Sequence, residues 1–207
     1  MKQYDRSYFD AWYRSPGRRV TSRAEVERKA RMVVGIAEHL LGRKIRSVLD
    51  VGCGEGVWQP ILQQLRPGSR YAGVDASEYV VQRFGKRRNI RLGSFGDLDA
   101  VGLANWYDLI VVCDVLHYLR APELRRGLAV IADHLGGVAY LEAYTRADEI
   151  TGDMDGFSLR SAREYRRMFH EADLRPVGLH CFVHGETGPI ITALEECAAG
   201  EKPRSQR

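Results

Sequence analysis

The sequence has few cysteines, and they are far apart. Cys53, Cys113, Cys181 and Cys197 form no Cys-x-x-Cys pair. Disulfide-rich domains and structural zinc sites both depend on closely spaced cysteines, so the pattern predicts neither. We expect small buried residues instead, and no bound metal.

Long apolar runs are also missing. No stretch reaches the roughly twenty residues that a helix needs to cross a bilayer. Residues 1–6 lack the apolar core of a secretory signal peptide. These absences favour a cytoplasmic protein without membrane contact.

A strong charge of one sign is absent as well. The 31 basic and 27 acidic side chains leave a formal net charge of +4, with histidine neutral. Arginines cluster at residues 14–19, 86–88, 125–126 and 163–167, on predicted helices or turns. We interpret these clusters as solvated surface, so nucleic acid is not an expected partner. The alternative is a phosphate-tracking patch, whose binding would weaken steeply with salt.

What is present suits one globular domain. With 207 residues, of which 44% are hydrophobic, the chain can bury a sizeable core. We expect three parts, namely an aromatic N-terminal segment (1–20), a single folded domain (21–197) and a disordered tail (198–207).

The most informative feature is the segment Val48–Gly56, where an apolar strand runs directly into a glycine-rich turn. Glycines 52, 54 and 56 have no Cβ, so the backbone can adopt positive φ and approach a ligand closely. A strand before such a loop and a helix after it are the context of a nucleotide-type cofactor site. The Gly-x-Gly-x-x-Gly spacing of a dinucleotide-binding loop is broken, because Val57 holds the third position.

Two carboxylates accompany this loop. Asp75 ends a second apolar strand about twenty residues downstream, where dinucleotide folds place an acid that accepts hydrogen bonds from ribose hydroxyls. Asp50 precedes the first loop glycine by two residues. A carboxylate there is unfavourable beside phosphates but suits a ligand with an ammonium and a sulfonium group, which favours S-adenosylmethionine over NAD. The predicted sheet also leaves no room for the separate substrate domain of a dehydrogenase.

Three segments, Val48–Gly56, Tyr71–Ser77 and Tyr107–Leu119, together resemble the class I S-adenosylmethionine-dependent methyltransferases, and the resemblance covers residues 22–195. It implies a glycine loop around the methionine part of the cofactor, an acid on the ribose and a third strand end beside the adenine. The cofactor-binding residues that it implies are Asp50, Gly52, Cys53, Gly54, Asp75, Ala76, Ser94, Phe95 and Cys113.

Departures from the family's motifs exclude several of its subtypes. Ser94 stands where many relatives have the aspartate of Gly-Asp-Ala, so the polar adenine contact comes from Asp97 or a backbone N–H. Neither asparagine of the chain precedes Pro-Pro, the motif that grips planar amino groups. No lysine lies between residues 86 and 202, which excludes the Lys-Asp-Lys-Glu ribose enzymes, and no metal-ligand trio of the catechol O-methyltransferase kind is recognisable. A metal-independent enzyme for small molecules remains.

Hydrophobic periodicity predicts alternating strands and helices, hence a parallel sheet with right-handed crossovers. The predicted strands are 46–51, 70–74, 89–92, 107–113, 138–142, 177–183 and 189–194, and the predicted helices are 22–41, 57–65, 77–85, 122–135 and 161–172. In this pattern Gly85 ends one helix, Gly136-Gly137 stops another, and Gly185–Gly188 turns the closing hairpin. The resemblance implies a Rossmann-like three-layer α/β sandwich whose mostly parallel seven-stranded sheet ends in a C-terminal antiparallel hairpin.

Candidate acceptor-side residues follow from the strand ends, because ligands of open α/β sheets bind outside the carboxyl ends of the strands. They are Asp114, His117, Glu142 and Tyr144. His117 is the candidate catalytic residue, since an imidazole can remove a proton from a hydroxyl as the methyl group leaves sulfur. The alternative is a wall residue held by hydrogen bonds, with catalysis by alignment alone.

Two segments are expected at the rim of the site. The N-terminal aromatic residues share one helical face, which predicts a lid over the cofactor or, alternatively, a contact with the sheet edge. They are Tyr4, Tyr8, Phe9, Trp12 and Tyr13. The acidic segment 143–159 is expected to select the acceptor, and its charge hints at a cationic or hydroxylated partner. Solvated loop acids are the alternative.

The leading hypothesis is an enzyme that transfers the methyl group of S-adenosylmethionine directly to a small-molecule acceptor, at oxygen rather than nitrogen. A second hypothesis is a methyltransferase of RNA or protein, which requires arginines around the mouth of the pocket. A third is a module that binds S-adenosylmethionine without catalysis.

Overall fold

The computed structural model describes residues 4–15, 22–150, 153–186, 188–189 and 191–192. The predicted tail 198–207 lies outside these residues. Within the described part of the chain, no helix combines the length and the apolar character that crossing a bilayer requires.

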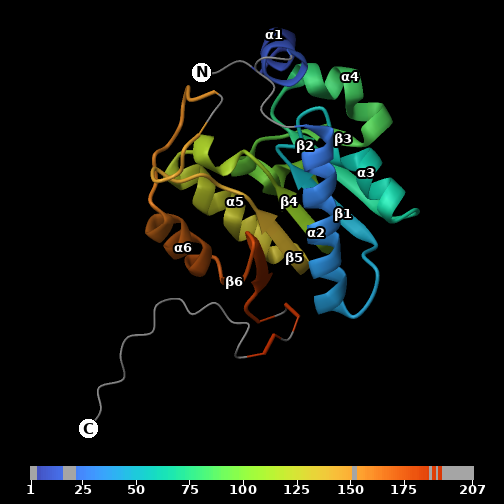
Figure 1. Cartoon of the computed structure of the whole chain (residues 1–207), viewed down its shortest axis with the longest axis vertical. Coiled ribbons are helices and arrows are strands. Elements are labelled where there is room, and N and C mark those ends of the chain that lie inside the picture. Colours follow the sequence, from blue (N-terminus) through green and yellow to red (C-terminus); the bar gives the residue numbers. More distant parts are fainter. Residues whose placement is uncertain (1–3, 16–21, 151–152, 187, 190, 193–207) are drawn as a thin grey trace.

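The seven strands of the described residues form one sheet, in the order β3-β2-β1-β4-β5-β7-β6. The strands are β1 (Ser47–Val51), β2 (Arg70–Asp75), β3 (Ile90–Leu92), β4 (Tyr107–Val112), β5 (Leu135–Leu141), β6 (Leu174–Gly178) and β7 (Cys181–His184). Strands β1 to β5 pair in parallel, and β7 runs antiparallel between β5 and β6. The predicted α/β architecture with its closing antiparallel hairpin is confirmed (Figure 1).

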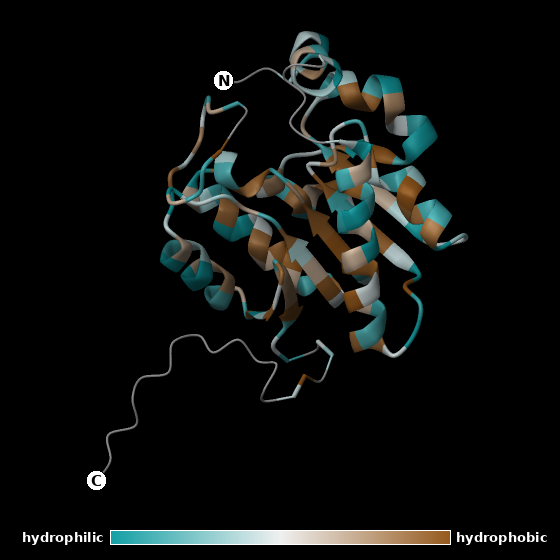
Figure 2. Cartoon of the chain, viewed as in Figure 1, coloured by the Kyte–Doolittle hydropathy of each residue, from teal (hydrophilic) through white to brown (hydrophobic). Residues whose placement is uncertain are grey.

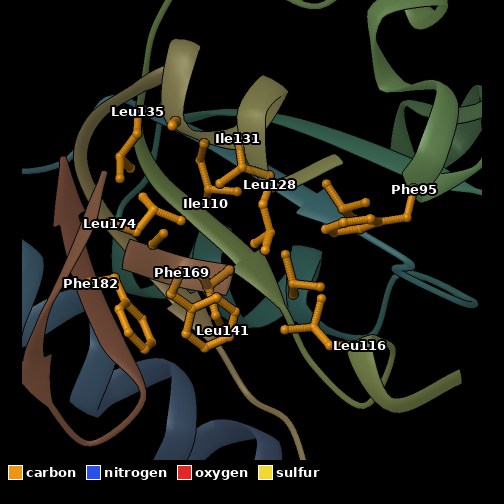
Figure 3. Packing of buried hydrophobic residues seen from close by; sticks show 14 of the residues in the cluster. Phe95, Ile110, Leu116, Leu128, Ile131, Leu135, Leu141, Phe169, Leu174 and Phe182 are labelled. Atoms are coloured by element: carbon orange, nitrogen blue, oxygen red, sulfur yellow. The ribbon is translucent and has the colours of Figure 1, made fainter. Parts of the chain in front are cut away.

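Helices cover both faces of this sheet. The helices of the described residues are α1 (Arg6–Phe9), α2 (Arg23–Leu41), α3 (Trp58–Leu65), α4 (Glu78–Arg88), α5 (Ala121–Asp133) and α6 (Ala162–Glu171), with a π-helical turn η1 (Asp10–Arg14) and the 3-10 turns η2 (Phe95–Val101) and η3 (Leu116–Tyr118). One hydrophobic cluster joins α2 and α3 to one face, and a second joins η2, α5 and α6 to the other (Figure 3).

The central strand β4 contributes to both clusters. Leu109 and Val111 belong to the first cluster, whereas Ile110 and Val112 belong to the second. The strand is therefore buried on both faces, as its nearly continuous apolar sequence predicts. Figure 2 shows the same distribution, with hydrophobic residues along the central strands and a largely hydrophilic α6.

One predicted helix end is wrong because a glycine serves packing rather than termination. Helix α4 continues through Gly85 to Arg88, and Asn89 follows with a left-handed φ of 52°. A Cβ on Gly85 would lie 3.0 Å from the carbonyl oxygen of Ile90. The glycine thus allows α4 to pack closely against β3.

The glycine pair after α5 also has a different role from the predicted one. Helix α5 ends at Asp133, and Leu135, predicted as its last apolar residue, begins β5. Gly136-Gly137 lies inside this strand, where a Cβ on the second glycine would be 2.2 Å from the carbonyl oxygen of Asp108. The pair therefore permits a close approach of β5 to β4.

The closing hairpin is formed by different residues from those predicted. Strands β6 and β7 are joined by Leu179 and His180, which both have left-handed φ, 50° and 61°. Two such residues are the pattern of a type I′ turn. The predicted strands 177–183 and 189–194 are wrong, since residues 185 and 186 already form a turn and residues 189, 191 and 192 are not in a strand. Leu-His carries none of the usual glycine or asparagine signals for this turn.

Candidate active site

The glycine loop connects β1 to α3 and bends sharply at its first glycine. Gly52 has φ of 68°, and a Cβ there would lie 2.2 Å from Val115 Cγ2. Its N–H donates to the carbonyl oxygen of Val74 at 2.8 Å, which holds the loop against the end of β2. The loop borders a cavity of about 300 Å³, here called the loop cavity, which Asp50, Gly52 and Asp114 help to line. No side chain fits at Gly52, so the backbone itself forms this wall.

Asp75, at the end of β2, is joined directly to the loop. Its Oδ2 accepts a hydrogen bond from the Gly54 N–H at 2.7 Å, and its Oδ1 accepts one from the Ser77 N–H at 2.9 Å. Burial raises the pKa of this carboxyl, and the two backbone hydrogen bonds oppose that rise. Each carboxylate oxygen can accept a further hydrogen bond. The structure thus brings together the predicted ribose ligand and the predicted loop.

Asp50 is a buried carboxyl in the wall of the loop cavity. Its Oδ2 accepts a hydrogen bond from Tyr71 Oη at 2.7 Å. Burial raises the pKa of Asp50 to about 7, although the tyrosine hydrogen bond favours the charged form. Within the described residues, Asp50 has no hydrogen bond or ion pair with a lysine or arginine. A cation in the cavity would compensate this charge, which is what the ammonium and sulfonium of S-adenosylmethionine offer.

The remaining predicted cofactor residues of β1, β2 and β4 also lie near these strand ends. Cys53 is buried and lines the loop cavity, and Cys113 lines it from the end of β4. Ala76 follows Asp75 and is exposed.

The two residues predicted beside the adenine, Ser94 and Phe95, have different surroundings. Ser94 Oγ donates to Asp97 Oδ2 at 2.6 Å, which leaves a polar pair at the end of β3. The Phe95 ring instead packs into the core beside Leu128 (Figure 3). A Cβ on Gly127 of α5 would lie 2.2 Å from this ring. The Phe95 side chain therefore anchors η2 to α5, and only its backbone remains for the predicted cofactor contact.

A second cavity of about 250 Å³, here called the acceptor cavity, lies at the carboxyl ends of β4 and β5. Its lining consists of Tyr8, Trp12, Tyr13, Glu25, Lys29, Cys113, Asp114, His117, Tyr118, Glu142, Tyr144, Glu149, Ile150 and Asp153. Three of these residues, Tyr13, Cys113 and Asp114, also line the loop cavity. The two cavities thus share a wall at the end of β4.

His117 and Asp114 form a pair in this shared region. His117 is only 1% exposed, stacks on Phe157 with a centroid distance of 4.6 Å, and places Nε2 3.2 Å from Asp114 Oδ1. The two side chains are thus within ion-pair distance of each other. The other ring nitrogen, Nδ1, is buried and has no hydrogen-bond partner among the described residues. Asp114 has a left-handed φ of 60°, a conformation that aspartate tolerates and that recurs at functional sites.

A charged cluster that the sequence did not reveal forms the floor of the acceptor cavity. Lys29 Nζ on α2 lies 2.8 Å from Glu142 Oε1 and 3.3 Å from Glu25 Oε1. Cys113 Sγ donates to Glu142 Oε2 at 2.7 Å. Burial tends to raise the pKa of Glu142, but the hydrogen bonds from Cys113 and Lys29 outweigh it and lower that pKa. The sequence feature that could have indicated this cluster is Lys29, which lies three residues after Val26 on the apolar face of α2.

The N-terminal aromatic segment covers the glycine loop. Phe9 is buried with Cys53 in a cluster that also contains residues of α4 and β3. A Cβ on Gly54 would lie 3.5 Å from the Phe9 ring and 3.6 Å from Tyr13 Oη. Ser77 Oγ donates a hydrogen bond to the carbonyl oxygen of Tyr4, close to the end of β2.

The acidic segment 143–159 lies on the same rim in its described part. Glu149, Ile150 and Asp153 line the acceptor cavity. Asp148 is instead used locally, because its Oδ2 accepts hydrogen bonds from Thr145 N–H and Oγ1 at 2.7 and 2.8 Å. Only some of these acids therefore face the site.

Comparison with known proteins agrees with this geometry. Residues 18–184 match the family model of a methyltransferase domain, Methyltransf_23. An uncharacterised protein of Synechococcus sp. is 32% identical over 106 residues, which cover 47% of this chain and 25% of that protein. The chain thus matches about a quarter of the length of this relative.

Several solved structures share the fold. The S-adenosylmethionine-bound amino pentose methyltransferase CalS10 from Micromonospora echinaspora has a TM-score of 0.63 and 18% identity, over 85% of this chain and 92% of that chain. The sugar N-methyltransferase KedS8 from Streptoalloteichus sp. has a TM-score of 0.61 and 19% identity, over 81% and 85%. DesVI from Streptomyces venezuelae has a TM-score of 0.59 and 19% identity, over 72% and 84%. With its family match, its fold and its loop cavity, the chain belongs to the class I S-adenosylmethionine-dependent methyltransferases.

Proposed function

We propose that the chain methylates the oxygen of a small molecule that binds in the acceptor cavity. The observation that carries this proposal is the shared wall of the two cavities. Asp114 borders the loop cavity, which contains the glycine loop and Asp50, and the acceptor cavity, which contains His117 and Glu142. A donor on one side and an acceptor on the other would meet at this residue.

The residues around the loop cavity fit S-adenosylmethionine, which supplies an electrophilic methyl group on a sulfonium when it is bound. We assign the charged end of the cofactor to Asp50, which lines the loop cavity. We assign its ribose hydroxyls to Asp75, which is hydrogen-bonded to Gly54 but is not among the described residues that line this cavity. Gly52 allows the sharp turn of the loop against Val115, and Gly54 lies under Phe9 and Tyr13. The Ser94–Asp97 pair is the polar group at the strand end assigned to the adenine.

The proton-handling groups are Asp114 and His117. We assign Asp114, which borders both cavities, to the acceptor side, and His117, whose Nε2 lies 3.2 Å from Asp114 Oδ1, to positioning that carboxylate. As the new O–CH₃ bond forms and the S–CH₃ bond breaks, the hydroxyl proton passes to Asp114. Alignment of the reacting atoms supplies much of the rate, with effective molarities that reach about 10⁵ M or more. In this proposal His117 is a positioning residue, which orients Asp114.

The position of the N-terminal segment supports our proposal that this segment is a lid over the cofactor. Phe9 and Tyr13 lie over Gly54, and Tyr8 and Trp12 line the acceptor cavity. Aromatic rings there exclude water from both cavities and bury a large apolar area.

The charge of the acceptor cavity favours a small molecule over nucleic acid. Its described lining has five carboxylates and a single lysine. A phosphate backbone requires basic side chains at the mouth, and this lining would repel it. The similar structures named as amino pentose and sugar N-methyltransferases also act on small molecules.

The experiment incubates the protein with methyl-labelled S-adenosylmethionine and fractionated mixtures of hydroxylated metabolites. Mass spectrometry should detect a product that is heavier by one methyl group and carries the label on oxygen. Gly54→Val, which strains the loop, should give no product. Label that enters only RNA or protein would contradict the proposal, and tight cofactor binding without any transfer would indicate a binding module.

A further inference from the structure

We infer that the acceptor carries a protonated amine, which the acceptor cavity binds through carboxylates and aromatic rings. This inference rests on the proposed function and specifies the substrate class of the same site. It follows from the charge, the hydrogen-bonding character and the shape of the cavity wall.

The cavity wall has an excess of negative charge. Its carboxylates are Glu25, Asp114, Glu142, Glu149 and Asp153. Lys29 is the single lysine or arginine in the described lining, and it is already engaged by two of these acids, at 2.8 and 3.3 Å. A bound cation would compensate the charges of Asp114 and Glu149, whereas a carboxylate or phosphate on the acceptor would be repelled.

The wall also offers hydrogen-bond acceptors. Asp114 and Glu149 line the cavity, and their carboxylate oxygens accept hydrogen bonds. The buried His117, whose Nδ1 has no partner among the described residues, belongs to the same wall. An ammonium group has N–H donors and no acceptor. It is therefore complementary to this wall in hydrogen bonding as well as in charge.

Aromatic rings line the same cavity. They belong to Tyr8, Trp12, Tyr13, Tyr118 and Tyr144. Rings of this kind attract organic cations to their faces. Burial and the negative charges of Asp114 and Asp153 raise the pKa of Tyr118, in agreement with a negative potential here.

The spacing of the acids points to an organic cation rather than a metal ion. No group of three or more His, Cys, Asp or Glu side chains in the described residues is arranged to hold a metal. Dispersed carboxylates interleaved with aromatic rings suit a larger cation whose charge is spread over an alkylammonium group.

The experiment uses three probes that share one shape and differ in charge, namely 2-phenylethylamine, 2-phenylethanol and phenylacetate. Each is titrated calorimetrically into the free protein and into the protein saturated with S-adenosylhomocysteine. The amine should bind at least about tenfold more tightly than the alcohol, and phenylacetate should bind more weakly than either.

Matched variants locate the preference in the cavity. Glu149→Gln should reduce the preference for the amine several-fold, with the affinities for the alcohol and for S-adenosylhomocysteine unchanged. The control Asp133→Asn removes an exposed carboxylate at the end of α5, outside the acceptor cavity lining, and should have no effect.

Equal binding of the amine and the alcohol, no binding of any probe at millimolar concentration, or an unchanged preference in Glu149→Gln would overturn the inference. Failure of S-adenosylhomocysteine to bind would instead count against the proposed function. The preference of the free protein for the amine would then still decide the inference.

Discussion

His117 Nε2 lies 3.2 Å from Asp114 Oδ1, and the imidazole side chain is 1% exposed whereas the carboxylate side chain is 40% exposed. The other ring nitrogen, Nδ1, is buried and has no hydrogen-bond partner among the described residues. In the proposed mechanism this difference in exposure gives the two residues different roles, with Asp114 on the acceptor side and His117 holding Asp114 in place.

The two roles predict different kinetic losses. Asp114→Asn should lower kcat by roughly 10²–10⁴-fold, as for the loss of a proton-accepting group. His117→Ala should lower kcat less, and His117→Gln should recover part of the loss because its amide N–H can still donate to Asp114. Steady-state kinetics with an identified acceptor measure these effects. Wild-type kcat in Asp114→Asn would remove the pair from the mechanism.

The raised pKa of Asp50 predicts that cofactor affinity depends on pH. Burial raises this pKa from its ordinary value of 3.8 to about 7, so between these pH values the folded protein binds more protons than the unfolded chain. The contribution of Asp50 to stability therefore falls as pH rises through this window. The cationic cofactor favours the charged carboxylate, so its affinity should rise between about pH 5 and 7, with release of a proton.

Calorimetry in buffers with different heats of ionisation measures that proton release. Asp50→Asn should remove the pH dependence in this range. Tyr71→Phe removes the hydrogen bond that favours the charged form and should move the midpoint to higher pH. An affinity that does not change with pH in the wild-type protein would disprove the assignment of Asp50.

Asp75 should contribute to both cofactor binding and loop stability. Asp75→Ala leaves ribose hydroxyls unpaired and should weaken S-adenosylhomocysteine binding by about 1.5–3 kcal/mol, the value of hydrogen bonds to a charged group. It also removes the acceptor for the N–H groups of Gly54 and Ser77, so the midpoint of thermal unfolding should fall. Asp99→Asn, an exposed acid of η2, is the control. Tight binding of NAD in place of S-adenosylhomocysteine would refute this assignment.

The lid proposal predicts faster release of the cofactor when the N-terminal segment is loosened. Phe9 is 2% exposed and anchors the segment, and truncation of a buried phenylalanine costs about 3–5 kcal/mol. Phe9→Ala should therefore accelerate dissociation of S-adenosylhomocysteine in stopped-flow measurements. Trp106→Ala, an exposed aromatic residue just before β4, should not. Equal dissociation rates in both variants would show that the segment is not a lid.

Two glycine-to-alanine substitutions should have opposite effects on stability. Gly35→Ala, in an exposed helix position with nothing within 4 Å of the new Cβ, should stabilise the fold by about 0.5–1 kcal/mol. Gly127→Ala would place its Cβ 2.2 Å from the Phe95 ring and should destabilise by about 1–3 kcal/mol. Urea unfolding measures both. Equal free energies of unfolding would mean that η2 packs more loosely on α5 than the structure indicates.

The sequence predicted the part of the site that depends on neighbouring strand ends. Asp50, the glycine loop and Asp75 follow parallel strands directly, so their meeting at one edge of the sheet follows from the fold class. The loop from Gly52 and the acid at Asp75 are found where the pattern placed them.

The rest depends on contacts between distant segments. Lys29 and Glu142 are separated by 113 residues, and their ion pair arises from the packing of α2 across the end of β5. The contact of His117 with Asp114 occurs beside a left-handed backbone at Asp114, which the sequence pattern does not predict. The predicted helix ends at glycines 85, 136 and 137 are wrong, because the sequence pattern does not distinguish a glycine that permits close packing from one that ends a helix.

The two outer strands of the sheet limit how this protein can associate with copies of itself. At one side β3 is only three residues long, and at the other β6 contains Arg175 and Pro176. A short strand, a charge and a residue without an N–H all leave few backbone groups for an incoming strand to pair with. Both edges of the sheet are therefore protected against growth into a fibril by strand addition.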